Sequence, residues 1–291
     1  LMLPNDPVVS NGIAYVTDTW GYRIFKTSLE SPSPEVFMSG PDHLLCSICT
    51  DPGTFDGPNG MELYDMGYYA DHPFLIIGRS GATTFGQTPA LIKAPIDDPD
   101  AVKTITVYPT VELLNGLDGV HFDAEKEILW ITTNAGFGTV VAIRSRPTAA
   151  APWDEAEVVA VYSAGCTYGD ATSSTIDANG DVLTLCAENF AMGPYALKRI
   201  PRMGMAYQAQ DATSFALDFP GLIPEGIAYQ PSTDRLLISP YGIDGANYFS
   251  SAIPGAGSVI DPSLRDIIVE VGSSTSTGSG WLKLMGTKVD P

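Results

Sequence analysis

The sequence predicts an all-β chain that folds as a six-bladed β-propeller with four-stranded antiparallel blades. Two observations lead to this prediction. Gly and Pro account for 29 and 23 of the 291 residues and are scattered along the whole chain, which is typical of many short strands separated by turns. A short motif also recurs at intervals that each have room for four strands of about five residues plus their turns.

The expected strands are runs rich in β-branched and aromatic residues, bounded by Gly, Pro, Asn or Asp. Stretches with helical periodicity are scarce. The runs are Ile13–Thr17, Arg23–Thr27, Phe74–Gly78, Ala90–Ala94, Lys103–Tyr108, Ile128–Thr133, Val140–Arg144, Glu157–Tyr162, Val182–Cys186, Tyr195–Ile200, Arg235–Ser239 and Asp266–Val271.

The recurring motif consists of a Pro or Leu, a polar residue, often a Gly, and then a short apolar strand. Its polar positions fall at residues 5, 59, 118, about 172 and 225. A four-stranded unit that repeats at this length indicates a propeller blade. We expect a single domain over residues 1–291, with a sixth blade completed by both termini or by residues that precede Leu1. A β-sandwich with coincidental repeats is the alternative.

The charge balance limits the classes of partner. Fifteen Lys and Arg residues against 34 Asp and Glu residues give a formal net charge of −19. Such a surface repels the phosphates of nucleic acids and anionic membranes, whereas it attracts divalent cations. No apolar run approaches the roughly 18–20 residues that span a bilayer. We expect a small-molecule substrate and neither a nucleic-acid nor a membrane partner, and we predict no oligomeric state.

Four cysteines leave the redox state open. Cys46 and Cys49 form a CxxC, but the Asp-Pro-Gly that follows indicates a turn instead of the helix of a thioredoxin-like motif. Cys166 and Cys186 lie far from this pair, and neither a second CxxC nor paired histidines complete a zinc site. Free thiols and one or two disulfides both fit. The even count favours an extracellular, secreted protein, with a cytoplasmic location as the alternative.

Equivalent residues that open successive blades converge at one end of the channel of a propeller. Here these residues are Asn5, Asn59, Asp118 and Glu225. Two carboxylates balance the charge of Ca²⁺, and two amide oxygens help to fill its large coordination shell. We therefore predict a site for Ca²⁺, or another divalent cation, at these four residues. Each Asn-Gly or Asp-Gly is by itself typical of a turn, and the shared phase of the motif favours the ligand interpretation.

His121 follows Asp118 by three residues on the same expected strand. We predict that His121 acts as a general base or orients a carboxylate, the alternative being a histidine packed between blades. Asp118 is the second catalytic candidate, because a metal-bound carboxylate can activate water or attack directly. Further candidates for the mouth of the channel are Glu62, Asp170, Glu188 and Asn189.

The segments LPND, GPNGMEL, LDGVHFDAEKEILWITTN and IPEGIAYQPSTDRLLIS resemble blade openings of the calcium-dependent phosphotriesterase superfamily. This superfamily includes the senescence-marker protein/gluconolactonase family, the paraoxonases, the squid-type organophosphate hydrolase and, more distantly, the strictosidine synthases. The resemblance spans most of the chain as short motifs.

In the hydrolases of this superfamily, one Glu and then, after a skipped blade, Asn, Asn and Asp hold the channel metal. Glu225, Asn5, Asn59 and Asp118 keep this cyclic order. The Glu comes last along this chain, however, whereas it normally comes first. Either the chain is permuted relative to the superfamily or Glu225 is one blade away from the true ligand.

The resemblance implies a metal-dependent hydrolase of a lactone, a related ester or a phosphotriester, with Ca²⁺ as Lewis acid. A second hypothesis is an enzyme like strictosidine synthase, in which Glu225 performs acid–base work without a catalytic metal. A third is a non-enzymatic propeller that binds a partner and holds a structural ion, because a fold does not determine a function. The sequence contains no Gly-x-Ser-x-Gly elbow, phosphate loop or dinucleotide fingerprint.

Overall fold

The computed structural model of the chain describes residues 4–49, 56–81, 86–134, 138–166, 170–187, 195–200, 222–230, 232, 235–242, 267–271 and 285–288. In these ranges the regular structure consists of β-strands and 3-10 turns of three or four residues. No helix in the described part of the chain is long and apolar enough to cross a bilayer. The chain divides into two compact units, one formed by Leu1–Ala135 and Val140–Val161, the other by Gly136–Thr139 and Tyr162–Pro291.

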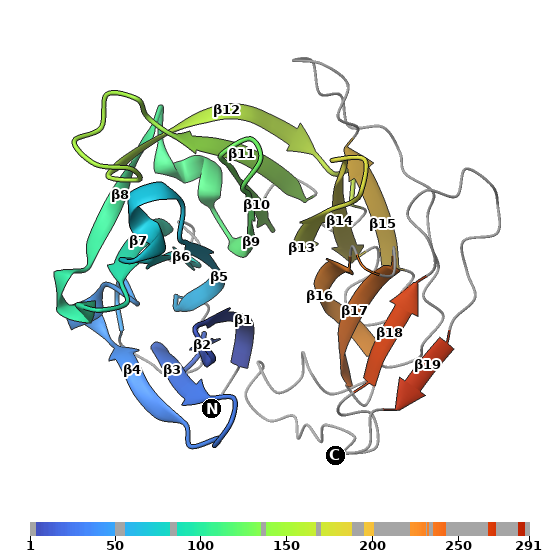
Figure 1. The fold of residues 1–291 in the computed structure, drawn as a ribbon. Helices are drawn as coiled ribbons and strands as arrows, with labels where there is room; N and C mark the ends of the chain where they lie inside the picture. Colours follow the sequence, from blue (N-terminus) through green and yellow to red (C-terminus); the bar gives the residue numbers. More distant parts are fainter. Residues whose placement is uncertain are drawn as a thin grey trace. The chain divides into compact units, whose positions relative to one another are not determined.

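The first unit contains three consecutive repeats of four strands (Figure 1). The first repeat is a four-stranded sheet in which each strand is antiparallel to the next along the chain. The strands of this unit are β1 Pro4–Ser10, β2 Ile13–Asp18, β3 Arg23–Ser28, β4 Glu35–Ser39, β5 Pro58–Tyr64, β6 Phe74–Arg79, β7 Ala90–Pro95, β8 Lys103–Tyr108, β9 Leu117–Asp123, β10 Ile128–Thr133, β11 Thr139–Ser145 and β12 Glu155–Ser163.

The repeats of the first unit pack their apolar faces on one another. Tyr15 and Ile24 of the first repeat share a buried cluster with Leu75 and Ile92 of the second. A second cluster joins Phe74 and neighbouring residues of the second repeat to apolar residues of β10 and β11 in the third. Burial of these β-branched and aromatic side chains from both faces is the main stabilising contribution to such a core.

The second and third repeats also join at their edges to form one eight-stranded sheet with the order β5-β6-β7-β8-β12-β11-β10-β9. The link is a short parallel pairing between Glu155–Glu157 of β12 and Thr106–Tyr108 of β8. This pairing covers edge strands that would otherwise expose unpaired backbone groups.

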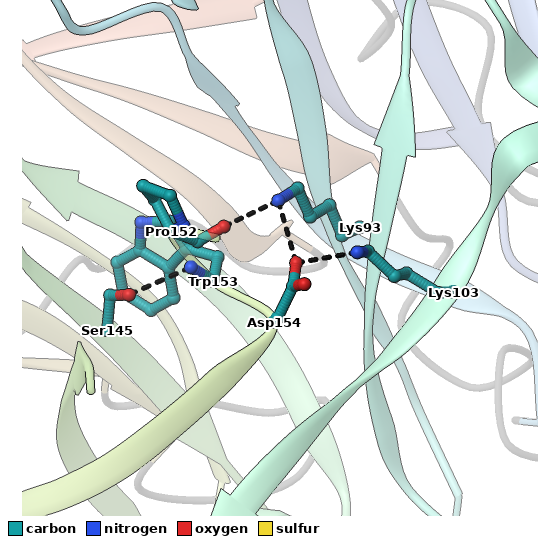
Figure 2. A network of polar contacts seen from close by, with 6 residues as sticks. All are labelled: Lys93, Lys103, Ser145, Pro152, Trp153 and Asp154. Carbon is teal, nitrogen blue, oxygen red and sulfur yellow. Dashed lines mark hydrogen bonds and ion pairs between the residues drawn. The ribbon is translucent and has the colours of Figure 1, made fainter. Parts of the chain in front are cut away.

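A polar network around the buried Lys93 ammonium anchors the turn that leads into β12 (Figure 2). Asp154 forms ion pairs with Lys93 (3.0 Å) and Lys103 (2.7 Å), and the Lys93 ammonium also donates a hydrogen bond to the Pro152 carbonyl. The backbone N–H of Trp153 donates to Ser145 Oγ at 2.8 Å. Burial lowers the pKa of Lys93. Burial alone would raise the pKa of Asp154, but its hydrogen bonds from the two lysines outweigh this and lower it.

The second unit contains a three-stranded sheet in the order β13-β14-β15 and a four-stranded sheet in the order β16-β17-β18-β19. A disulfide between Cys166 and Cys186 ties the segment before β13 to β14, and a second disulfide joins Cys46 and Cys49 in the first unit. The strands are β13 Asp170–Ile176, β14 Val182–Ala187, β15 Tyr195–Ile200, β16 Leu222–Gln230, β17 Arg235–Gly242, β18 Ile267–Val271 and β19 Met285–Lys288.

The prediction of an all-β chain built from short strands is confirmed, and every strand run expected from the sequence overlaps an observed strand. The short strands β4 and β19 were not expected, because their sequences EVFMS and MGTK lack a clear apolar alternation. The number of blades and the single domain over the whole chain stay predictions.

Candidate functional site

The first strand of each repeat, called here the opening strand, carries an irregularity near its start. The opening strands are β1, β5, β9, β13 and β16. In β1, Pro4 pairs with Asp18 and the next pair is Pro7 with Val16, so two residues of β1 face one residue of β2. The register shifts in the same way between Pro58 and Met61 of β5, between Leu117 and Val120 of β9 and between Ala171 and Ser174 of β13. In β16 a single extra residue, Glu225, lies between Pro224 and Gly226, whose partners in β17 are adjacent.

The residues predicted as cation ligands lie in these bulges. Asn5, Asn59 and Asp118 each follow the first paired residue of their opening strand, and Glu225 occupies the bulge of β16. The bulge of β13 has Thr172 at the equivalent place. A β-bulge re-aims the side chain of the extra residue and occurs frequently beside active sites.

The openings of the first unit lie against one another. β1 lies beside β5, and β5 lies beside β9. A Cβ added to Gly60 would lie 2.4 Å from the backbone nitrogen of Val120 and 2.6 Å from the carbonyl oxygen of Asp118. Only a glycine therefore permits this approach of β5 to β9.

The two carboxamides of the predicted site are in direct contact. Asn5 Nδ2 donates a hydrogen bond to Asn59 Oδ1, and Asn59 Nδ2 donates to the Leu117 carbonyl at 3.4 Å. Asn59 and Asp118 are 5% and 9% exposed. The structure thus brings Asn5 and Asn59 together and places Asp118 directly after the Leu117 carbonyl that Asn59 contacts.

Buried threonines hold the openings in place, a feature that the sequence analysis did not identify. Thr17 Oγ1 donates to the Asn59 carbonyl and Thr19 Oγ1 donates to the Pro58 carbonyl, both at 2.8 Å. Thr132 Oγ1 accepts from the Gly119 N–H at 2.8 Å. These bonds satisfy backbone groups that the bulges remove from the regular ladder. The sequence signal that could have revealed this feature is a threonine opposite the motif in the paired strand, namely Thr17 in β2 and Thr132 in β10.

Three ionisable side chains gather beside these openings. His121 Nδ1 lies 3.1 Å from Glu62 Oε1, and each residue follows a predicted ligand by three positions, on β9 and β5 respectively. Asp6 on β1 accepts a hydrogen bond from the Met61 N–H at 3.0 Å.

The environment of this group shifts two of its pKa values. The surrounding strands remove most of the Asp6 carboxyl from water, which raises its pKa to about 7. The hydrogen bond from the Met61 N–H opposes this rise, and the negative charge of Glu62 adds to it. Burial lowers the pKa of His121, but its hydrogen bond to Glu62 and the negative charges of Glu62, Asp6 and Asp123 outweigh burial, so that the net shift is upward.

A divalent cation such as Ca²⁺ needs several oxygen ligands close together. Among the described residues, no three His, Cys, Asp or Glu side chains form a group that could hold a metal ion. The predicted site depends instead on two carboxamides. The adjoining Asn5 and Asn59 amides offer neutral oxygen ligands, and Asp118, a buried residue that follows the Leu117 carbonyl contacted by Asn59, offers a single carboxylate. A set of oxygen ligands with little negative charge fits a hard cation such as Ca²⁺.

The remaining predicted residues belong to the second unit or fall outside the described residues. Glu225 is on β16 and Asp170 is on β13, both in the second unit, and the side chains of both fall outside the described part of the structure. Glu188 and Asn189 also lie outside the described residues. The other two histidines, His43 and His72, for which no role was predicted, pair with Asp100 and Asp97 and are not on opening strands.

No protein-family model matches the chain, and no curated protein matches it. Among solved structures, a catalytically inactive virginiamycin B lyase from Staphylococcus aureus, determined with quinupristin, has a TM-score of 0.52 at 13% identity, covering 99% of this chain and 70% of that chain. The β-propeller domain of Cps50 (Swd1) from Myceliophteria thermophila has a TM-score of 0.50 at 11% identity, covering 97% and 72%.

The calcium-binding protein regucalcin from Agrobacterium tumefaciens has a TM-score of 0.46 at 15% identity, covering 89% of this chain and 88% of that chain. A similarity of this size supports no argument about function. The chain also spans 26% of each of two longer matches, extracellular domains of putative one-component and hybrid two-component systems from B. thetaiotaomicron. The virginiamycin B lyase and Cps50 matches, at 13% and 11% identity, show the fold alone. The chain is a β-propeller, as the sequence predicts.

Proposed function

We propose that the protein is a cation-dependent hydrolase that acts on a lactone or a related ester. Asn5, Asn59, Asp118 and Glu225 hold the cation in this proposal, with Ca²⁺ as the preferred ion. The observation that carries the proposal is the bulge that β1, β5 and β9 share in phase, which holds Asn5, Asn59 and Asp118 at equivalent positions and brings the Asn5 and Asn59 amides into contact.

A bound Ca²⁺ supplies a Lewis acid that polarises the carbonyl oxygen of the substrate. The chain supplies the remaining functions. Asp118 contributes the carboxylate of the first unit to the ligand set, and the two asparagines contribute neutral oxygens. His121 takes the proton of the attacking water, since its imidazole is partly exposed and lies on the same strand as Asp118.

Two properties of the whole chain support this proposal. The net charge of −19 favours a cation and a small neutral or weakly charged substrate over a polyanion. The disulfides Cys46–Cys49 and Cys166–Cys186 favour an oxidising compartment, and we propose an extracellular location, where Ca²⁺ is abundant.

The proposal is tested by measuring hydrolysis of γ- and δ-lactones and aryl esters while Ca²⁺ is titrated into chelator-treated protein. We expect turnover that depends on Ca²⁺ and falls at least 100-fold in Asn59→Ala and Asp118→Ala. Asn179→Ala is the matched control, because Asn179 is an exposed turn residue outside the phase of the motif. Turnover that survives excess chelator, or equal activity in all three variants, contradicts the proposal.

One observation favours a second candidate, a non-catalytic propeller with a structural ion. The Asn5 and Asn59 amides already satisfy part of each other's hydrogen-bonding capacity, as a packed structural interior requires. This candidate predicts that Ca²⁺ raises the melting temperature without hydrolysis of any ester in the panel. Calorimetry in parallel with the activity assay separates the two candidates.

A further inference from the structure

We propose that Glu62 is a positioning residue that fixes the tautomer of His121, so that Nε2 of His121 is the general base of the site. The catalytic half of this inference rests on the proposed hydrolase function. The positioning half does not, because the protonation of an imidazole is measurable without substrate.

The repeat geometry brings the two side chains together. Glu62 and His121 occupy the same position of neighbouring opening strands, three residues after Asn59 and Asp118. β5 lies beside β9, and the close approach at Gly60 sets the spacing of the two strands. The resulting contact joins His121 Nδ1 to Glu62 Oε1 at 3.1 Å.

The chemistry of the contact selects one tautomer. An ionised carboxylate only accepts hydrogen bonds, so the imidazole nitrogen that faces Glu62 must carry the proton. Nδ1 of His121 is therefore the donor, and in the neutral ring Nε2 holds the lone pair. Among the described residues, Nε2 has no hydrogen-bond partner that would compete for this lone pair.

The charges that face His121 come from several strands. Glu62 lies on β5, Asp6 on β1 and Asp123 on the same strand as His121, and all three favour the imidazolium form against the effect of burial. The pKa of His121 is thereby raised, which makes Nε2 a stronger base once the ring is neutral.

The accessibility of the pair fits a functional role. The His121 and Glu62 side chains are 29% and 23% exposed, so a water or small molecule can reach them while the strands restrict their motion. The chain contains a comparison pair in His72 and Asp97, which also joins Nδ1 to a carboxylate, at 3.3 Å. That pair is 52% and 60% exposed, and neither of its residues is on an opening strand.

The positioning half is tested by ¹⁵N NMR of the three histidine rings across a pH titration. In wild type we expect neutral His121 to carry its proton on Nδ1. Glu62→Gln should lower the pKa of His121 but keep this tautomer, because the Gln carbonyl still accepts from Nδ1. Glu62→Ala should lower the pKa and shift the proton toward Nε2. Asp97→Asn is the matched control, because it alters another His–carboxylate contact, and it should leave the tautomer and the titration of His121 unchanged.

A wild-type neutral ring that is protonated on Nε2, or a His121 titration that is unchanged in Glu62→Gln, overturns the inference. Should Glu62→Ala fail to fold, the titration of Glu62→Gln still decides the outcome.

The catalytic half is tested by the pH dependence of kcat on a lactone that the protein hydrolyses. We expect the acidic limb to move to lower pH in Glu62→Gln. In Glu62→Ala the plateau should fall by about 10- to 100-fold, the size typical for residues that orient a functional histidine. A changed melting temperature with an unchanged pH profile shows a merely structural pair and refutes the inference. Absence of hydrolysis on every substrate refutes the proposed function and, with it, this catalytic half, while the NMR result still decides the positioning half.

Discussion

Gly60→Ala is the substitution that most sharply tests the close approach of the opening strands. The added Cβ would lie 2.4 Å from Val120 N and 2.6 Å from Asp118 O, whereas ordinary contact begins at 3.4 Å. The opening of β9 must therefore move by about 1 Å, and both clashing atoms belong to backbone that cannot rotate away. Overpacking of a rigid interior costs about 1–3 kcal/mol, and we expect a loss near 3 kcal/mol.

The assay is urea unfolding of Gly60→Ala in the presence of chelator, followed by calorimetric titration with Ca²⁺. Gly12→Ala is the matched control, because Gly12 has a φ of +76° but nothing within 4 Å of an added Cβ. The control should lose about 1–2 kcal/mol from its backbone conformation alone. Its cation affinity should be unchanged, while that of Gly60→Ala should fall at least tenfold. A Gly60→Ala protein that is no less stable than the control refutes the close approach.

Further predictions concern stability. Folding raises the pKa of Asp6 from 3.8 to about 7 and therefore favours its protonated carboxyl. The stability linked to this protonation is fully present below pH 3.8 and is lost as the pH rises through about 7. The shift corresponds to at most about 4 kcal/mol. Since Asp6 is partly exposed, we expect Asp6→Asn to raise the free energy of unfolding by about 1–3 kcal/mol at pH 8 and by almost nothing near pH 4, measured by urea unfolding in chelator. Replacing both cysteines of the Cys166–Cys186 disulfide by alanine opens a 20-residue loop and should cost about 3 kcal/mol in the same assay; an unchanged midpoint contradicts this. Asp154→Ala leaves the buried ammonium of the Figure 2 network without its carboxylate and should cost about 2–4 kcal/mol, whereas Lys103→Met, at the exposed lysine, should cost less than about 1 kcal/mol. Equal losses in these two variants would show that the network is not anchored at the buried lysine.

Much of the fold was predictable because strand formation here follows local sequence. Runs such as Lys103–Tyr108 and Ile128–Thr133 combine β-branched residues with flanking turn residues, and both match observed strands to the residue. The phase of the repeat was also visible, since each opening strand places the same type of motif at its bulge. The parallel pairing of β8 with β12 was not predictable, because nothing local marks which edges meet.

The candidate site was predictable in part. The phase of the motif predicted Asn5, Asn59 and Asp118 as site residues. In the structure Asn5 contacts Asn59, and Asn59 contacts the carbonyl of Leu117, the residue before Asp118. The pairing of His121 with Glu62 could not be derived, because it depends on the register of two strands that lie far apart in sequence. The raised pKa of Asp6 depends on burial by other strands, which a single motif does not reveal. The disulfide between Cys166 and Cys186 likewise depends on the β13–β14 register.

The central claim is that β1, β5 and β9 contribute ligands to one cation, and an anomalous-scattering map of crystals grown in Ca²⁺ tests it most directly. The account predicts a peak at about 2.3–2.6 Å from the side-chain oxygens of Asn5, Asn59 and Asp118. The claim would be contradicted by a map that shows no anomalous peak at this site at saturating Ca²⁺ while the Asn5 and Asn59 amides remain hydrogen-bonded to each other.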